Sequence, residues 1–136
     1  MQVKKLYYQS FVPTKKSACA AGYDLIAPFG GCLSKGLNTV GIGISIALPE
    51  WNYGRIACRS SLAAKNISVE AGVIDNDYRG EIKVLLRNHS DEPYHYKSGE
   101  RIAQLIITPY TDVSIMVIDK LDETARGAGG FGSTGK

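Results

Sequence analysis

The amino-acid sequence predicts an all-β fold, a sandwich or a barrel such as a jelly roll. Apolar residues alternate with small residues across 40–48, which is the pattern of a strand with one buried face. Other strand-like segments are short, and each is bounded by Gly, Pro, Asn, Asp or Ser. Many short strands with almost no helix are typical of sandwiches and barrels.

The predicted elements follow one another along the chain. One short helix is expected at 62–65, where Ser60 or Ser61 can cap the start and Asn66 can end it. The sequence contains no internal repeat. The expected strands are 2–8, 40–48, 54–57, 80–86, 94–97, 102–109 and 114–118.

Composition narrows the class of protein. The chain has 136 residues, 44% of them hydrophobic and 21% charged, as in an ordinary globular domain. Its net charge of +3 comes without a long basic run, so we expect an anionic small molecule rather than nucleic acid as the partner. Three cysteines without a CxxC spacing favour a reducing compartment over a disulfide framework or a metal site. Because no membrane-spanning run or signal-peptide core is present, we expect an intracellular protein, cytoplasmic or nuclear, with no membrane partner.

The C-terminal segment differs from the rest of the chain. Five of the nine residues from 127 to 135 are glycine, and such a segment is expected to be mobile when free. We therefore predict a β domain over 1–121 and a flexible arm over 122–136. From composition alone, the arm is either a plain Gly/Ser tail or a lid that orders on a nucleotide.

The lid hypothesis depends on four side chains of the arm. Arg126 can grip a phosphate with its planar guanidinium, and Phe131 offers a flat face to a base. Ser133 and Thr134 add hydroxyl donors beside glycine N–H groups that can converge on an anion.

A polar turn at 71–80 interrupts two apolar segments. Asp75 directly follows an apolar pair, so its carboxylate can be held rigidly and act as a general base on water. The alternative is that Asp75, Asn76 and Asp77 are simply turn formers.

Three further positions have a functional and a structural explanation. Arg59 stands beside the expected helix start, where N–H groups attract phosphate, or it is an ordinary surface arginine. Asp24 lies in a strand-like context, which is unusual without being diagnostic. Gln104 lies in an apolar strand. It is either a buried amide that hydrogen-bonds a specific partner or a residue on the polar face of an edge strand.

The histidines give no sign of catalysis. His89 and His95 are expected at the surface, and no Ser–His–Asp order, HExxH motif or Walker A loop is present.

Together, five segments spread over 20–135 resemble the motifs of the trimeric dUTPase family. The strongest are GVIDNDYRG at 72–80, GERIAQL at 99–105 and RGAGGFGSTG at 126–135. The resemblance implies a distorted jelly-roll β-barrel with one short helix and a mobile Gly-rich C-terminal arm. It implies a Mg²⁺-dependent hydrolase that cleaves dUTP at the α-phosphate to dUMP and pyrophosphate. This activity limits uracil incorporation into DNA and supplies dUMP for thymidylate synthesis.

The resemblance also implies a homotrimer with active sites shared between subunits. The third motif comes from one chain, the first, second and fourth largely from another, and the arm from the third. In the first motif, Asp24 helps to hold Mg²⁺ through water. In the second, Arg59, Ser60 and the N–H group of Ser61 contact the α- and β-phosphates.

The remaining roles implied by the resemblance concern the base, the sugar and the reacting water. Asp75 orients and deprotonates the attacking water, and Gln104 bonds a phosphate or that water. Tyr78 packs under the deoxyribose and leaves no room for a 2′-hydroxyl group. Main-chain groups of the hairpin, including Gly72 and Ile74, read uracil. The arm closes over the site with Arg126, Phe131, Gly132, Ser133 and Thr134.

One departure from the family pattern bears on the rate. The second motif usually reads Pro-Arg-Ser-Gly, and here it is Cys58-Arg59-Ser60-Ser61. If the family's glycine adopts a positive φ, Ser61 would be strained there, and its side chain could also crowd the phosphates, so the catalytic rate depends on this position.

Three other functions also fit parts of the sequence. One is a dCTP deaminase of the same fold family, which needs a glutamate near the base, yet no Glu precedes Glu81 in the third motif. Another is a nucleotide-binding regulatory module without turnover. The third is a plain jelly-roll adhesion or capsid domain.

Overall fold

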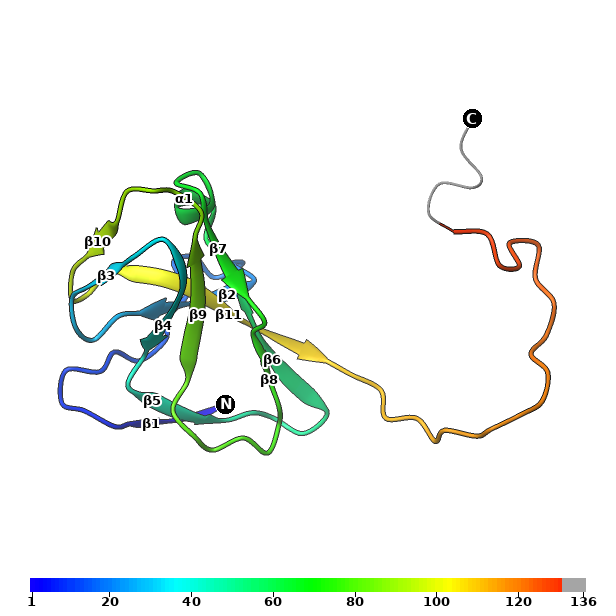
Figure 1. Cartoon of the computed structure of the whole chain (residues 1–136). Helices are drawn as coiled ribbons and strands as arrows, with labels where there is room; N and C mark the ends of the chain where they lie inside the picture. The colour runs from blue at the N-terminus through cyan, green and yellow to red at the C-terminus, as the bar shows by residue number, and fades with distance from the viewer. Residues whose placement is uncertain (131–136) are drawn as a thin grey trace.

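Antiparallel β-strands form nearly all of the regular structure in the computed structural model, which describes residues 1–130 (Figure 1). A single short helix, α1 (Ser60–Ala63), interrupts them. The strands are β1 (Gln2–Lys5), β2 (Gly22–Ile26), β3 (Gly31–Leu33), β4 (Gly36–Gly41), β5 (Ile44–Ala47), β6 (Asn52–Ala57), β7 (Ile67–Glu70), β8 (Val73–Ile74), β9 (Lys83–Asn88), β10 (Tyr94–Tyr96) and β11 (Arg101–Pro109).

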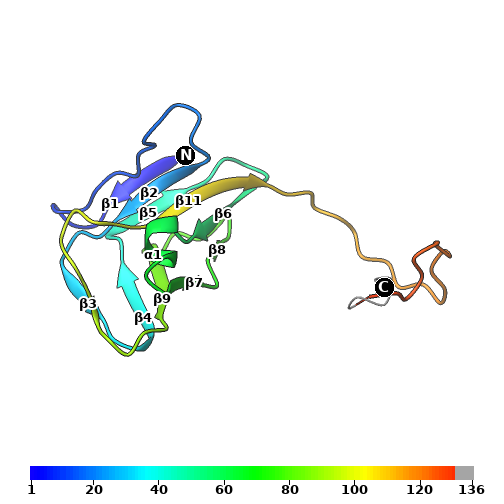
Figure 2. The same cartoon turned by 90° about the horizontal axis from the view of Figure 1, so that it is seen from above.

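The strands associate in two larger sheets and two pairs. The first sheet has the order β2-β11-β6-β8 and the second the order β4-β9-β7, while β1 pairs with β5 and β10 with β3. The long strand β11 lies between β2 and β6, and all the registers are antiparallel. The view from above shows these sheets wrapped around a common interior (Figure 2).

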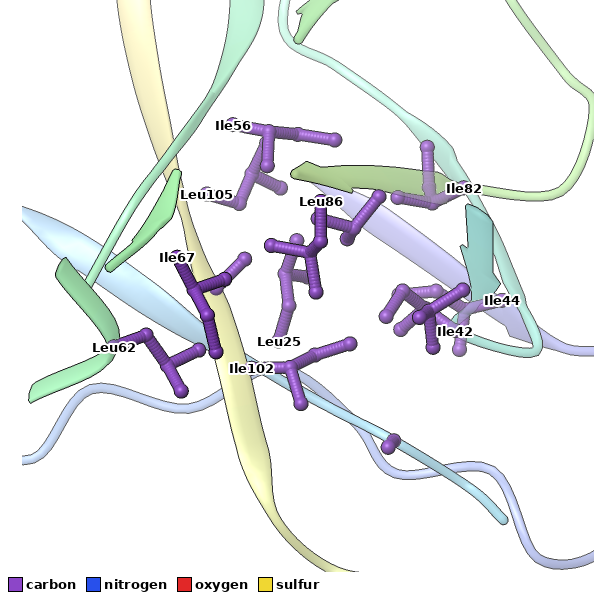
Figure 3. Close-up of a cluster of buried hydrophobic side chains, with 14 of the residues drawn as sticks. Leu25, Ile42, Ile44, Ile56, Leu62, Ile67, Ile82, Leu86, Ile102 and Leu105 are labelled. Atoms are coloured by element: carbon purple, nitrogen blue, oxygen red, sulfur yellow. The ribbon is translucent and has the colours of Figure 1, made fainter. Parts of the chain in front are cut away.

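Branched aliphatic side chains from both larger sheets fill that interior. Figure 3 shows Leu25, Ile56 and Leu105 from the first sheet beside residues such as Leu86 from the second. These side chains are almost fully buried, and burial of apolar surface is the main stabilising contribution to such a fold. The predicted all-β fold with one short helix is confirmed.

The segment 40–48, predicted as one strand, is divided between β4 and β5. The break lies at Gly43, whose φ of +72° is in the left-handed region. Its carbonyl accepts hydrogen bonds from Ser10 Oγ at 2.6 Å and from Leu6 N at 2.8 Å. The alternation of buried residues survives the break, because Ile42 and Ile44 both face the core.

The strand predicted at 114–118 is wrong for this chain. After β11 ends at Pro109, residues 110–130 form no helix or strand, and they run away from the barrel (Figures 1 and 2). Ile115 and Val117 are 93% and 95% exposed, so the alternating pattern has no partner strand within the described chain. The division between 1–121 and 122–136 stays a prediction. Among residues 1–130, no helix is long and apolar enough to cross a membrane.

Candidate functional site

The turn between β6 and α1 carries the first group of predicted site residues. Arg59 is the N-cap of α1, with an extended backbone and no side-chain cap bond, so the prediction of Ser60 or Ser61 as cap residue is wrong. Ser61 lies within the helix. Positive φ at non-glycine residues of 1–130 occurs elsewhere, at Trp51, Asn66 and Ala71. Serine at position 61 therefore carries no left-handed strain.

The side chain of Arg59 is bound to Asp24 rather than free on the surface. Arg59 Nε lies 3.3 Å from Asp24 Oδ1, and Arg101 Nη1 lies 3.3 Å from Asp24 Oδ2. Arg59 Nη1 also donates to the Arg101 carbonyl at 2.8 Å. The Asp24 side chain is only 16% exposed, so it holds two guanidinium groups together at the edge of the sheet.

Gln104 occupies the centre of the same sheet. It is the cross-strand neighbour of Asp24 on β2 and of Ala57 on β6. Its Nε2 donates to the Cys58 carbonyl at 3.0 Å, so Gln104 is an amide with a specific partner. A Cβ atom added to Gly22 would lie 2.6 Å from Gln104 Oε1, so glycine at position 22 leaves room for the amide.

These residues line one cavity, which we call the basic cavity. Its volume is about 220 Å³. Sequence reasoning did not assign Lys16 or Arg101 to a site. Arg101 stands within the fourth motif, whereas nothing in the sequence around Lys16 marks it. The lining residues are Lys16, Ala20, Gly22, Asp24, Arg59, Ser60, Arg101 and Gln104.

The polar turn at 71–80, which we call the hairpin, is anchored on β6, and its strand β8 pairs with β6 rather than with β9. Strand β8 pairs with Gly54–Arg55 of β6, and the Gly72 carbonyl accepts a hydrogen bond from Ile56 N at 2.7 Å. Gly72 has a φ of +104°, a conformation that glycine adopts at little cost. Asn76 Nδ2 donates to the carbonyls of Pro49 and Asn52 at 2.7 and 3.0 Å, and this fixes the turn against the loop before β6 and the first residue of that strand.

The hairpin presents Asp75 and Tyr78 at a second cavity. Asp75 is exposed, and its carbonyl accepts a hydrogen bond from Tyr78 N at 3.2 Å. Tyr78 donates its hydroxyl to the Glu81 carbonyl at 3.0 Å. This hairpin cavity has a volume of about 150 Å³ and is lined by Val73, Ile74, Asp75, Tyr78, Glu81 and Lys83.

The basic cavity and the hairpin cavity have no lining residue in common. The fold of one chain therefore brings Asp24, Arg59 and Gln104 together, and separately brings Asp75 and Tyr78 together. It does not join the two groups in one cavity.

The described part of the arm makes local contacts. Arg126 Nε donates to the Gly129 carbonyl at 2.9 Å, and Gly127 N donates to the Thr124 carbonyl at 3.0 Å. Arg126 is exposed and lines neither cavity. The other predicted arm residues, Phe131, Gly132, Ser133 and Thr134, lie outside the described residues.

The donor atoms around Asp24 can be compared with the needs of Mg²⁺. Within residues 1–130, no three His, Cys, Asp or Glu side chains gather into a metal cluster. Asp24 supplies the one carboxylate among the residues that line the basic cavity. Mg²⁺ commonly keeps several waters and binds one or two carboxylates plus substrate phosphates. The residues fit a magnesium ion that arrives with a triphosphate, and they do not form a protein cage.

The thiols and imidazoles play no evident part in either cavity. All three cysteines are free, and His89 and His95 are exposed, as expected. Cys32 Sγ lies 4.0 Å from His95 Nε2 across the β3–β10 pair. Burial, with a smaller contribution from the charge of Cys32, raises the pKa of Tyr96 above its ordinary value.

The fold and the two cavities define an all-β protein with one cavity lined by Lys16, Arg59 and Arg101 and a separate turn that carries Asp75 and Asp77. The chain belongs to the dUTPase family, because the family model named dUTPase matches residues 9–135.

Relatives of known name agree with this membership. The chain is 53% identical to the deoxyuridine 5′-triphosphate nucleotidohydrolase of Saccharomyces cerevisiae, with 91% of this chain and 86% of the relative covered. It is 49% identical to the Arabidopsis thaliana protein of the same name, with 98% of this chain and 82% of that relative covered.

Solved structures share the fold. A Staphylococcus bacteriophage 80alpha dUTPase mutant with dUpNHpp gives a TM-score of 0.89 at 25% identity, with 99% of this chain and 98% of that chain covered. A dUTPase mutant from phage phi11, described with a structural Mg(II) ion, gives a TM-score of 0.81 at 20% identity, with 88% of this chain and 96% of that chain covered. The latter likeness concerns the fold alone.

Proposed function

We propose that this chain hydrolyses dUTP at the α-phosphate and releases dUMP and pyrophosphate. The observation that carries the proposal is identity near one half, over nearly the whole chain, to nucleotidohydrolases of deoxyuridine 5′-triphosphate. The two cavities supply the required parts, which are cationic side chains for phosphates and a carboxylate for water.

The basic cavity is the part that holds the triphosphate. Arg59 and Arg101 are preorganised by Asp24, so their guanidinium groups meet an incoming polyanion without a large rearrangement. Ser60 and Ser61 add donors from the first turn of α1. Gln104, whose Nε2 is engaged by Cys58, keeps its Oε1 for a water or a protonated group.

Asp24 is the residue that would hold Mg²⁺, through water. When bound, the ion neutralises charge on the triphosphate and favours departure of pyrophosphate. Asp24 would share its carboxylate between the two arginines and the hydration shell of the ion.

The hairpin supplies the base for hydrolysis. Asp75 accepts a proton from a water molecule whose oxygen forms the new bond to the α-phosphorus. The bond from the α-phosphorus to the bridging oxygen breaks, and pyrophosphate leaves. Because Asp75 is exposed on an anchored turn, it is accessible to a substrate held by another element.

The same hairpin discriminates among nucleotides. Fixed main-chain groups around Gly72 and Ile74 pair with uracil and oppose the reversed donors of cytosine. The hairpin lies too close to the base to admit the methyl group of thymine, and Tyr78 leaves no room for a 2′-hydroxyl group. The carboxylate of Glu81 is engaged by Gly43 N at 2.9 Å, which supports the hydrolase over a deaminase that needs a free glutamate.

Three chains would complete each site. The basic cavity of one subunit would meet the hairpin cavity of a second, and the arm of a third would close over both. Two features support this homotrimer: the two cavities share no lining residue, and residues 110–130 extend away from their own barrel. In this arrangement Arg126, Phe131, Ser133 and Thr134 would reach the γ-phosphate and the base.

Pyrophosphate release from purified protein tests the function. We would supply dUTP, dCTP, dTTP and UTP in parallel with Mg²⁺ and assay ammonia from dCTP. Release from dUTP alone supports the proposal. Ammonia from dCTP would identify a deaminase, and binding of dUTP without turnover would identify a regulatory module.

A further inference from the structure

Three hydrogen bonds connect the N-terminal segment to Tyr78 through Glu81. Ser10 Oγ donates to the Gly43 carbonyl at 2.6 Å, and Gly43 N donates to Glu81 Oε1 at 2.9 Å. The main-chain carbonyl of Glu81 accepts the hydroxyl of Tyr78 at 3.0 Å. Glu81 therefore makes two contacts. Its side chain binds the buried N–H group of Gly43, and its main-chain carbonyl binds the hydroxyl of Tyr78 at the hairpin cavity.

Two contacts hold Glu81, which lies outside the strands. One is the carboxylate bond to Gly43 N, and the other is the peptide that Glu81 shares with Ile82, whose N–H group donates to the Ile44 carbonyl at 2.8 Å. Glu81 precedes β9, which begins at Lys83, and the main-chain bonds across this region resume at Ile82. A Cβ atom added to Gly41 would lie 2.6 Å from Glu81 Oε1, so the carboxylate lies directly over this glycine. The side chain is thus held in one place between the ends of β4 and β5.

The buried N–H group of Gly43 requires a hydrogen-bond acceptor, and the Glu81 carboxylate provides it. Gly43 is buried at the break between β4 and β5, and a buried N–H group without an acceptor is costly. A bond to an ionised acceptor is stronger than a neutral one. Ser10, only 3% exposed, holds the opposite side of the same residue.

Tyr78 depends on the hydroxyl bond for its orientation. Its side chain stands partly in solvent, at 42% exposed. The ring lies over Gly80, where an added Cβ atom would come within 2.5 Å of Tyr78 Cζ. The glycine permits this placement, and the bond to the Glu81 carbonyl selects it.

We infer that Glu81 is a positioning residue for sugar discrimination, acting through Tyr78. The inference rests on the proposed function, in which Tyr78 excludes a 2′-hydroxyl group. If the carboxylate releases Gly43, the carbonyl at 81 shifts and Tyr78 moves away from the sugar. UTP then enters more easily, while the phosphate contacts are unchanged.

The test compares kcat/KM for dUTP with kcat/KM for UTP in the full-length protein. Glu81→Ala is expected to lower the dUTP/UTP ratio about tenfold, mainly by raising turnover of UTP, as loss of one charged hydrogen bond allows. Glu81→Gln keeps an acceptor oxygen and should stay near the parent ratio. Glu70→Ala, which removes a partly exposed carboxylate bonded to Arg87 and Ser68, is the matched control and should leave the ratio unchanged.

A double-mutant cycle separates positioning from general destabilisation. Tyr78→Phe removes the same hydroxyl bond and should lower the ratio, and adding Glu81→Ala to it should have no further effect. Glu81→Asp withdraws the carboxylate from Gly43 N and takes the place of Glu81→Ala should that variant fail to fold; it should lower the ratio in the same direction. An unchanged ratio in the folded Glu81→Ala variant, or in Glu81→Asp where it is used instead, would overturn the inference. Full additivity with Tyr78→Phe would overturn it too. A parent protein inactive on dUTP overturns the proposed function as well, whereas an active parent with an unchanged ratio overturns only the role of Glu81.

Discussion

Asp24 and Gln104 face each other across the β2–β11 pair, although they are far apart in the sequence. The pairing places a carboxylate and an amide at the same cavity, together with Arg59 and Arg101. The charge of Asp24 is balanced by both arginines, each 3.3 Å away. Its removal should therefore affect the arginines as well as any ion.

Asp24→Asn should raise the Mg²⁺ concentration needed for half-maximal velocity. The neutral amide holds the hydration shell of the ion less strongly and no longer draws the two guanidinium groups together. Loss of such an outer partner typically costs about 10–100-fold in activity or metal affinity. Magnesium titrations at fixed dUTP measure the effect, and an identical Mg²⁺ dependence in the variant would contradict the role given to Asp24.

Asp75→Asn should abolish pyrophosphate release without loss of stability. The side chain is exposed, and the hairpin is held by main-chain bonds and by Asn76, so the amide is tolerated in the fold. Loss of a general base lowers kcat on the order of 10²–10⁴-fold. Single-turnover kinetics with thermal unfolding as the control checks both parts. Substantial turnover by a folded variant would assign the proton transfer to another group.

Ser61→Gly should leave kcat unchanged and slightly weaken the fold. Ser61 has an exposed side chain in α1 and no positive φ, so the glycine usual in the family relieves nothing here. Glycine is less favourable than serine within a helix by about 0.5 kcal/mol. Steady-state kinetics and denaturant unfolding test this pair of expectations. A clear rise in kcat would mean that the serine side chain crowds the phosphates in the bound state.

The sequence predicts best those elements that depend on local pattern. The segments predicted at 54–57 and 102–109 lie on β6 and β11, and the segment predicted at 94–97 exceeds β10 by one residue, because alternation and turn residues suffice to define them. The break at Gly43 was missed since it depends on Ser10 and Glu81, whose contacts with it are tertiary. Pairing with β6 likewise creates the two-residue strand β8, which no local pattern marks.

The candidate site shows the same division. Arg59 and Gln104 were identifiable from their motifs, yet the contact of Arg59 with Asp24 and that of Gln104 with the Cys58 carbonyl join residues far apart in the sequence, so no local pattern indicates them. The exposed segment at 114–118 has a strand pattern without a strand, because a pattern cannot say whether a partner is present.

Gly72→Ala should destabilise the protein and displace the hairpin. At a φ of +104°, a side chain is strained, and its Cβ would lie 2.8 Å from the Ile56 carbonyl oxygen. We expect a loss of about 1–3 kcal/mol in the free energy of unfolding. Denaturant unfolding measures it, and Gly130→Ala, where an added Cβ meets no atom within 4 Å, is the control. Equal stability of the two variants would show that the turn relaxes freely.

Removal of residues 122–136 should abolish turnover while the barrel keeps its stability. From Asp122 to Gly130 the chain is largely exposed, and its hydrogen bonds are local, as between Arg126 and Gly129 or between Gly127 and Thr124. Nothing in the barrel should therefore sense the deletion in a thermal unfolding experiment. Turnover should fall because closure over the nucleotide is lost. Arg126→Ala in the full chain is the finer variant, and it should raise KM for dUTP through loss of a phosphate contact. A truncated protein with parental kcat/KM would show that the arm is a plain tail, whereas loss of activity with unchanged unfolding would assign it to the site.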